Sequence, residues 1–137
     1  MGKSQNIEDV SLKKIFYSVL RRQDETYAGS LEGLFKGFQR VNFSNNPVIN
    51  TALVQDIAFD SINDILWLAT NQGLHGLKND KLVQSFTTEN GLSNNNCNYI
   101  QFDKHNQIWF GTHQGVNIVN TKTSKVNIID LSNGLPS

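Results

Sequence analysis

Residues 97–119 read CNYIQFDKHNQIWFGTHQGVNIV, and residues 54–77 read VQDIAFDSINDILWLATNQGLHGL. With one residue deleted before the tryptophan, the two stretches share aromatic, acidic, hydroxyl and glycine positions: Phe59 with Phe102, Asp60 with Asp103, Trp67 with Trp109, Thr70 with Thr112, and Gly73 with Gly115. In a looser third copy, Tyr27, Ser30 and Gly33 occupy the same places 40 residues before the second copy. The chain is therefore built from a repeat of about 40 residues.

Each copy contains short stretches with the period of β-strands. In the second copy Ile57 and Phe59 alternate with more polar or smaller residues, which places apolar side chains on one face. Asn, Asp and Gly separate the stretches, and they tolerate the positive φ of tight hairpin turns. Four strands are expected in each copy: near 13–20, 25–30, 33–36 and 38–43; near 54–60, 64–70, 73–78 and 81–87; and near 97–103, 107–112, 115–121 and 125–131.

A repeat of four short strands predicts an all-β fold, a β-propeller fragment of about three four-stranded antiparallel blades. Helical repeats of similar length would show a 3.6-residue period, which is absent. A sandwich or barrel does not explain why the aromatic, hydroxyl and glycine positions return in phase. The expected divisions are a tail or start of the first strand at 1–12, blade 1 at 13–50, blade 2 at 51–93, and blade 3 with its crossover at 94–137.

The repeated pattern resembles one known family. Residues 109–116 read Trp-Phe-Gly-Thr-His-Gln-Gly-Val, each later copy contains Phe-Asp, and Asn-Gly-Leu endings occur at 90–92 and 133–135. This pattern is similar to the two-component regulator propeller repeat of the periplasmic sensor regions of Bacteroidetes-type hybrid two-component systems. The resemblance covers residues 13–137, with three departures: Tyr27 replaces tryptophan, Ala69 replaces glycine, and the first copy lacks the Asn-Gly-Leu ending.

The resemblance implies a ligand-sensing propeller whose parent protein places it in the periplasm or another extracytoplasmic space, ahead of a membrane helix and a kinase. Many members of the family sense oligosaccharides. Kinase, receiver and DNA-binding parts are absent from this sequence, so the resemblance implies no signalling activity for the chain by itself.

Composition limits the classes of partner. Twelve basic and twelve acidic side chains balance, and the longest basic run is Arg21-Arg22, so nucleic acid is not expected to bind. The single cysteine, Cys97, excludes an internal disulfide and is expected to be a buried strand thiol. No stretch has the length of a membrane span, and the first residues lack the apolar core of a signal peptide, so the fragment is expected to be soluble and to make no membrane contact.

Most conspicuous side chains receive a structural interpretation. Because a tryptophan recurs once per copy, Trp67 and Trp109 are expected to fill the gap between neighbouring blades rather than to stack on sugars. Asp60 and Asp103 are expected to cap turns. No metal or cofactor is expected, because the three histidines, His75, His105 and His113, show no ligand spacing. The structural repeat set is Tyr27, Gly33, Trp67, Thr70, Gly73, Trp109, Thr112 and Gly115.

Polar loop residues supply the candidate binding site. Turns between the second and third strands reach the same end of a blade as the crossover loops, because the strands alternate in direction. Side-chain amides there suit sugar hydroxyls better than charged ligands, although ordinary polar loop surface would have the same composition. The predicted ligand-binding set is Asn71, Gln72, His113, Gln114, Asn94, Asn95 and Asn96.

The predicted function is ligand sensing without catalysis. No nucleophile elbow, phosphate-binding loop or catalytic triad signature occurs in the sequence. The chain is therefore interpreted as the propeller portion of a two-component regulator or sensor histidine kinase that binds an oligosaccharide or another small polar ligand. Two alternatives stay open: a propeller lyase or hydrolase of the streptogramin-lyase-like type, and a protein-interaction scaffold.

Three blades cannot close a ring. Propellers typically close with four to eight blades, and closure covers the apolar faces between blades. The expected partners are therefore the remaining blades of a larger propeller or a second copy joined head to tail into a six-bladed ring. Without such a partner, apolar side chains would be uncovered at both ends: Phe16, Val19, Ile118 and Ile128.

Overall fold

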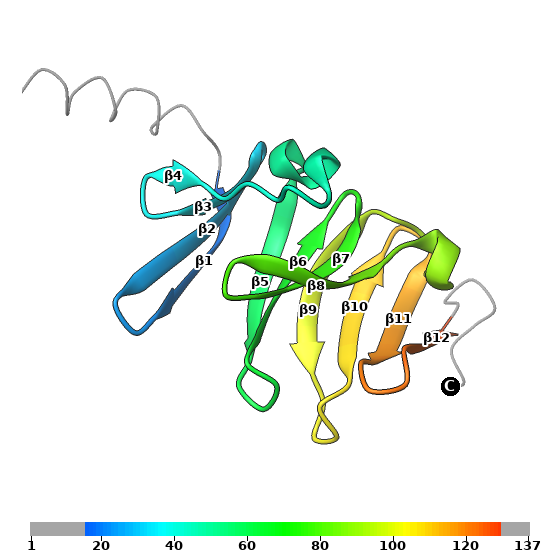
Figure 1. Cartoon of the computed structure of the whole chain (residues 1–137). Coiled ribbons are helices and arrows are strands. Elements are labelled where there is room, and N and C mark those ends of the chain that lie inside the picture. Colours follow the sequence, from blue (N-terminus) through cyan, green and yellow to red (C-terminus); the bar gives the residue numbers. More distant parts are fainter. Residues whose placement is uncertain (1–15, 130–137) are drawn as a thin grey trace, which may run out of the picture.

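The computed structural model describes residues 16–129, which form three four-stranded antiparallel sheets (Figure 1). Within each sheet the strands lie side by side in chain order, as in a propeller blade. Blade 1 contains β1 (Phe16–Arg22), β2 (Glu25–Ser30), β3 (Gly33–Lys36) and β4 (Gln39–Arg40). Blade 2 contains β5 (Val54–Asp60), β6 (Ile65–Thr70), β7 (Gly73–Lys78) and β8 (Lys81–Phe86). Blade 3 contains β9 (Cys97–Phe102), β10 (Ile108–Thr112), β11 (Gly115–Asn120) and β12 (Lys125–Ile129).

The predicted all-β class and the four strands per repeat are confirmed. The clearest difference is β4, which has two residues in place of the expected 38–43, although the Val41 N–H still donates to the Leu34 carbonyl at 2.8 Å. The crossovers contain short 3-10 helices, η1 (Pro47–Thr51) and η2 (Thr88–Asn90). The expected tail at 1–12, the start of the 13–20 strand and the Asn-Gly-Leu ending at 133–135 lie outside the described residues.

The hydroxyl of each repeat closes the turn between the second and third strands. Thr70 Oγ1 donates to the Gly73 carbonyl at 2.8 Å and accepts the Gln72 N–H at 2.9 Å. Ser30 and Thr112 make the same pair of bonds in blades 1 and 3. Gly73 follows with a φ of 107°, and a Cβ there would overlap the Phe86 carbonyl oxygen. The repeated Ser/Thr and glycine positions are therefore turn residues, as predicted.

The apolar core lies between blades. One cluster joins blades 1 and 2 around Tyr27, Leu34 and Leu68, and a second joins blades 2 and 3 around Trp67, Leu74 and Phe110. Tyr27 and Trp67 occupy the same repeat position, and each projects toward the following blade. The structure confirms the interpretation of Trp67 as a filler between blades, because its side chain is 0% exposed.

The innermost strands of the three blades share a β-bulge that the sequence analysis did not predict. The register shifts between Phe16 and Ser18 in β1 and between Val54 and Asp56 in β5, and β9 shows the same irregularity after Cys97. In the central blade this bulge carries Asp56. Its carboxylate accepts the Ser18 hydroxyl of blade 1 at 3.1 Å and the Ile100 N–H of blade 3 at 2.8 Å. Asp56 thus connects all three blades.

Cys97 is buried on β9 within the second cluster, as the sequence predicted. Burial raises the pKa of its thiol to about 12, so the thiolate that reacts with oxidants or metals is scarce near neutral pH.

Candidate functional site

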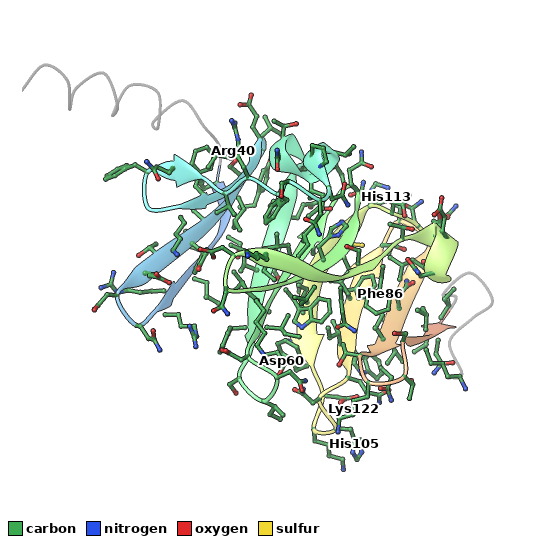
Figure 2. The ribbon with its side chains drawn as sticks, viewed as in Figure 1. Arg40, Asp60, Phe86, His105, His113 and Lys122 are labelled. Atoms are coloured by element: carbon green, nitrogen blue, oxygen red, sulfur yellow. The ribbon has the colours of Figure 1, made fainter. Side chains whose placement is uncertain are left out.

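The predicted binding residues lie at one end of blades 2 and 3. Asn71 and Gln72 form the β6–β7 turn, His113 and Gln114 form the β10–β11 turn, and Asn94, Asn95 and Asn96 belong to the crossover before β9. Figure 2 shows His113 at this end, whereas Asp60 and His105 lie at the opposite end. We call the first end the crossover rim and the second the hairpin rim.

Side chains of the crossover and the β10–β11 turn form one hydrogen-bonded network. Asn96 Nδ2 lies 3.3 Å from His113 Nε2, and Asn94 Nδ2 donates to Gln114 Oε1 at 3.3 Å. The Asn96 N–H donates to Asn94 Oδ1 at 2.8 Å and joins the two pairs. Gln55, which the sequence analysis missed, joins from β5 by donating to Asn96 Oδ1 at 3.0 Å. The network therefore consists of four amide side chains and one imidazole, all partly or fully accessible.

Three of the seven predicted residues are not part of this network. Asn71 Oδ1 accepts the Leu53 N–H at 3.0 Å, and Asn95 Oδ1 accepts the Thr88 N–H at 2.8 Å. The Asn95 carbonyl also accepts the Gly73 N–H, which ties the β6–β7 turn to the crossover. Gln72 is exposed in that turn. These contacts give Asn71 and Asn95 structural roles that residue type alone did not reveal.

His75 on β7 holds the β6–β7 turn from inside. Its Nε2 donates to the Gln72 carbonyl at 2.8 Å, so Nδ1 accepts the Ser85 hydroxyl at 2.8 Å in the neutral tautomer. The side chain is buried, and burial lowers its pKa although the bond to Gln72 acts in the opposite direction. His75 is thus a structural residue of the rim.

Acid should weaken the fold through His75. In the unfolded chain His75 binds a proton near its ordinary pKa of about 6.5, whereas in the folded chain its pKa is lower. The contribution of neutral His75 to stability is therefore fully present above pH 6.5, and it is lost as the pH falls toward the folded pKa. We expect a loss of up to about 1 kcal/mol per pH unit just below pH 6.5, measured by urea unfolding. His75→Gln should flatten this slope. Equal slopes in His75→Gln and the wild type would contradict the assignment.

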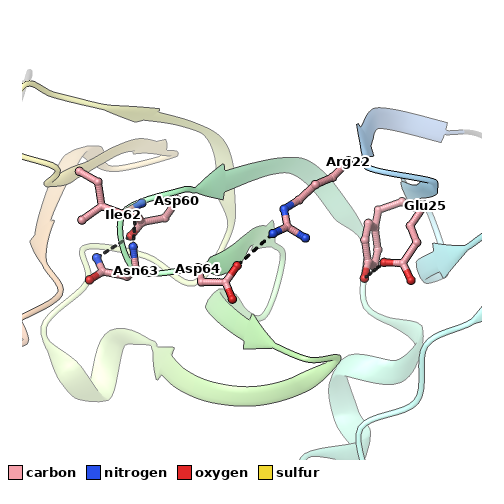
Figure 3. Close-up of polar contacts among 7 residues, drawn as sticks. Arg22, Glu25, Asp60, Ile62, Asn63 and Asp64 are labelled. Atoms are coloured by element: carbon pink, nitrogen blue, oxygen red, sulfur yellow. Dashed lines mark hydrogen bonds and ion pairs between the residues drawn. The ribbon is translucent and has the colours of Figure 1, made fainter.

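The hairpin rim contains the two aspartates expected to cap turns. Asp60 accepts the backbone N–H groups of Ile62 and Asn63 (Figure 3), and Asp103 accepts those of His105 and Gln107. Burial alone would raise the pKa of Asp60, but the hydrogen bonds from Asn63 and other donors lower it overall. For Asp103, the Gln107 N–H and the Trp109 indole lower the pKa. These bonds confirm turn capping.

The hairpin rim also links neighbouring blades through a repeated contact, which we call the strand-end latch. The last residue of an innermost strand bonds to a positive-φ residue in the first hairpin of the next blade. Arg22 donates to Asp64 at 3.1 Å (Figure 3), and Asn106 donates to Asp60 at 3.0 Å. The corresponding residue of blade 3 is Asp103, and its own Trp109 Nε1 donates to it at 2.9 Å.

A cavity of about 270 Å³ adjoins the first latch, between blades 1 and 2. Its charged groups pair with one another: Lys36 Nζ lies 3.1 Å from Glu25 and 2.7 Å from Asp80, which also accepts the Tyr27 hydroxyl at 2.8 Å. Burial and the bond to Asp80 raise the pKa of Tyr27 to about 12. This cluster fixes the outer part of the junction between the two blades.

Trp109 differs from its counterpart Trp67. It is 36% exposed and borders a cavity of about 430 Å³ on the outer face of blade 3, together with Tyr99, Gln101 and Val116. Its repeat position is the predicted one, but residues 16–129 contain no following blade to cover it. Phe16, Val19 and Ile128 are exposed as expected, whereas Ile118 is half-buried.

The described residues contain no group of three or more His, Cys, Asp or Glu side chains arranged to hold a metal ion. Within the same range, no helix has the length and apolar character that crossing a membrane requires.

Comparison with known proteins supports the repeat assignment. Residues 91–114 match the family described as two component regulator propeller, which confirms the resemblance from the crossover into blade 3 through the β10–β11 turn. Among curated proteins, none matches the chain significantly.

Two solved structures share the fold. One is the extracellular domain of a hybrid two component system from B. thetaiotaomicron, with a TM-score of 0.70 and 20% identity over 90% of this chain. The other is PorZ, a bacterial surface component of the type-IX secretion system of Porphyromonas gingivalis, with a TM-score of 0.60 and 20% identity over 76% of this chain. The chain spans only 18% and 21% of these two proteins.

Proposed function

We propose that this chain is part of the ligand-sensing propeller of a two-component regulator or sensor histidine kinase and binds a small polar ligand, of which an oligosaccharide is the best fit. The observation that carries the proposal is the family match at 91–114. That segment contains both the crossover and the β10–β11 turn, from which four members of the crossover-rim network come. An extracytoplasmic location follows from the same reasoning, since the first matched structure is an extracellular domain.

The network has the chemistry of a sugar site. Amide side chains both donate and accept hydrogen bonds, as sugar hydroxyls do, and the five members of the network are Gln55, Asn94, Asn96, His113 and Gln114. Hydrogen bonds within the network orient these groups before a ligand arrives, which reduces the entropy lost on binding. The network contains no carboxylate or ammonium group, which favours a neutral ligand.

The ionisable groups with shifted pKa values support binding rather than catalysis. Asp60 and Asp103 cap turns, Cys97 is a buried thiol, and His75 holds a turn from the interior. Catalytic groups usually combine a shifted pKa with access to substrate in a cleft. Each of these shifts is caused by burial or by hydrogen bonds that hold the fold together.

Titration of the isotope-labelled chain with neutral oligosaccharides tests the proposal. We expect NMR shifts in the side-chain amides of Asn94, Asn96 and Gln114, and about tenfold weaker binding in His113→Ala, the loss of roughly one hydrogen bond. His105→Ala, on the hairpin rim, is the matched control and should bind normally. Shifts confined to the hairpin rim, or equal weakening by both variants, would contradict the site.

The isolated chain should also be inert. Signal transfer requires a ligand that binds two receptor states with different affinities, and the output parts of such a receptor are not in this sequence. We therefore expect neither autophosphorylation nor release of new reducing ends from the oligosaccharides that bind. Turnover of a bound oligosaccharide would favour the lyase or hydrolase alternative.

A further inference from the structure

The outer face of blade 3 has the features of a blade junction but lies uncovered in the described part of the chain. Trp109 is accessible there, although Trp67 at the same repeat position is fully covered by blade 3. Within residues 16–129 the strand-end latch is also incomplete, because Asp103 bonds to its own Trp109 and not to a following hairpin. Both features point to a missing partner with the shape of a blade.

We propose that this face binds blade 1 of a second copy of the chain, head to tail. Blade 1 has the complementary face uncovered, since Phe16 is 41% exposed and Val19 is 65% exposed. Strand pairing places Phe16 at the position of Val54 and Cys97, and Val19 at the position of Ile57 and Ile100. In blades 2 and 3 those residues are buried against the preceding blade. The proposal does not depend on the proposed ligand.

Charge on the two faces is complementary. At the junction of blades 1 and 2, the Arg22 guanidinium lies 4.0 Å from the centre of the Phe59 ring. The repeat counterpart of Arg22 on blade 3 is Asp103, and the counterpart of Phe59 on blade 1 is Arg21. A head-to-tail junction built like the first one would therefore bring Asp103 of one copy beside Arg21 of the other. Gln23, at a φ of 58° in the same hairpin, adds an amide donor.

Side-chain size is complementary as well. On blade 3 the strand partner of Trp109 is Ile118, whereas the partner of Trp67 is Gly76. A Cβ on Gly76 would come to 3.0 Å from the Trp67 ring, so Ile118 leaves Trp109 less room over its own sheet than Trp67 has. Blade 1 offers space for it, because Ala28 stands where blades 2 and 3 have Leu68 and Phe110.

Sedimentation velocity over roughly 1 to 100 µM, the range of moderate dissociation constants, tests the proposal. The mass of the wild type should rise from one copy to two. Val19→Glu blocks the blade 1 face and Tyr99→Lys blocks the blade 3 face, and both side chains are exposed, so folding should survive. Each variant alone should associate at least about tenfold more weakly. Their equimolar mixture should recover a dimer, because each variant retains one intact face.

The control is Ile62→Glu, a change of the same kind at a side chain that is 73% exposed in the β5–β6 turn, on neither face. It should associate like the wild type. Acrylamide quenching gives an independent readout: Trp109 should become shielded as concentration rises, while Trp67 stays shielded throughout. A wild type that stays monomeric over the whole range would overturn the proposal. So would a Val19→Glu variant that still pairs with itself, since that would indicate contact between two blade 3 faces.

Discussion

Replacing Trp67 with alanine is expected to lower the free energy of unfolding by about 3–5 kcal/mol, whereas Trp109→Ala is expected to cost about 1 kcal/mol or less. The two residues occupy the same repeat position on the second strand of their blades, but Trp67 is 0% exposed and Trp109 is 36% exposed. Truncation of Trp67 would open a void between blades 2 and 3, where Leu74 and Phe86 now contact the same cluster. At Trp109 solvent would simply fill the space.

Urea unfolding followed by far-ultraviolet circular dichroism measures both variants, because each change removes one of the two tryptophans and alters fluorescence. The protein should be at about 1 µM, so that self-association does not shield Trp109. Trp67→Phe is an informative third variant. It keeps an aromatic ring and removes the Nε1–H of Trp67, a buried donor that has no partner among the described residues, so it should cost less than alanine. If Trp67→Ala and Trp109→Ala lowered the free energy of unfolding equally, Trp109 could not lie on an uncovered face of blade 3.

The regular part of the fold could be predicted from the sequence because it depends on local signals. Thr70, Gly73 and their counterparts return in phase, and each copy closes the same turn with the same two bonds. Irregular parts lack such signals. The short β4 lies in the first copy, which keeps fewer repeat residues, and the bulge in each innermost strand leaves the alternation of Ile57 and Phe59 unchanged.

The candidate site was less predictable from the sequence. A polar side chain in a turn either faces solvent or accepts a hydrogen bond from a backbone N–H group, and residue type does not distinguish the two. Asn71 and Asn95 do the latter, as the Leu53 and Thr88 N–H groups show. Gln55 was missed because it lies within a strand, where a polar residue ordinarily indicates the solvent face. The state of Trp109 could not be predicted from the repeat either, since burial of that position depends on the next blade.

Asp56→Ala is expected to lower the free energy of unfolding by about 2–4 kcal/mol, the second large effect. The carboxylate accepts the Ile100 N–H at 2.8 Å and the Ile57 N–H at 2.9 Å, and it binds the Ser18 hydroxyl. Alanine would leave the Ile100 N–H without its acceptor between two blades, and an unpaired buried donor is costly. Asp56→Asn keeps one acceptor oxygen and should lose roughly half as much.

Asp64→Ala is the matched control for Asp56, because it also removes an aspartate that links two blades. Asp64 pairs with Arg22, but its side chain is 56% exposed and water replaces the contact, so the expected loss is about 0–1 kcal/mol. Hydrogen exchange gives the local test. The Ile100 amide should exchange faster in Asp56→Ala than in the wild type, and its exchange rate should be unchanged in Asp64→Ala. A loss in Asp56→Ala no larger than in the control would show that apolar packing alone joins the blades. The predicted larger loss would instead mean that one carboxylate aligns the three innermost strands. Asp56 on β5 bonds to Ser18 on β1 and to Ile100 on β9.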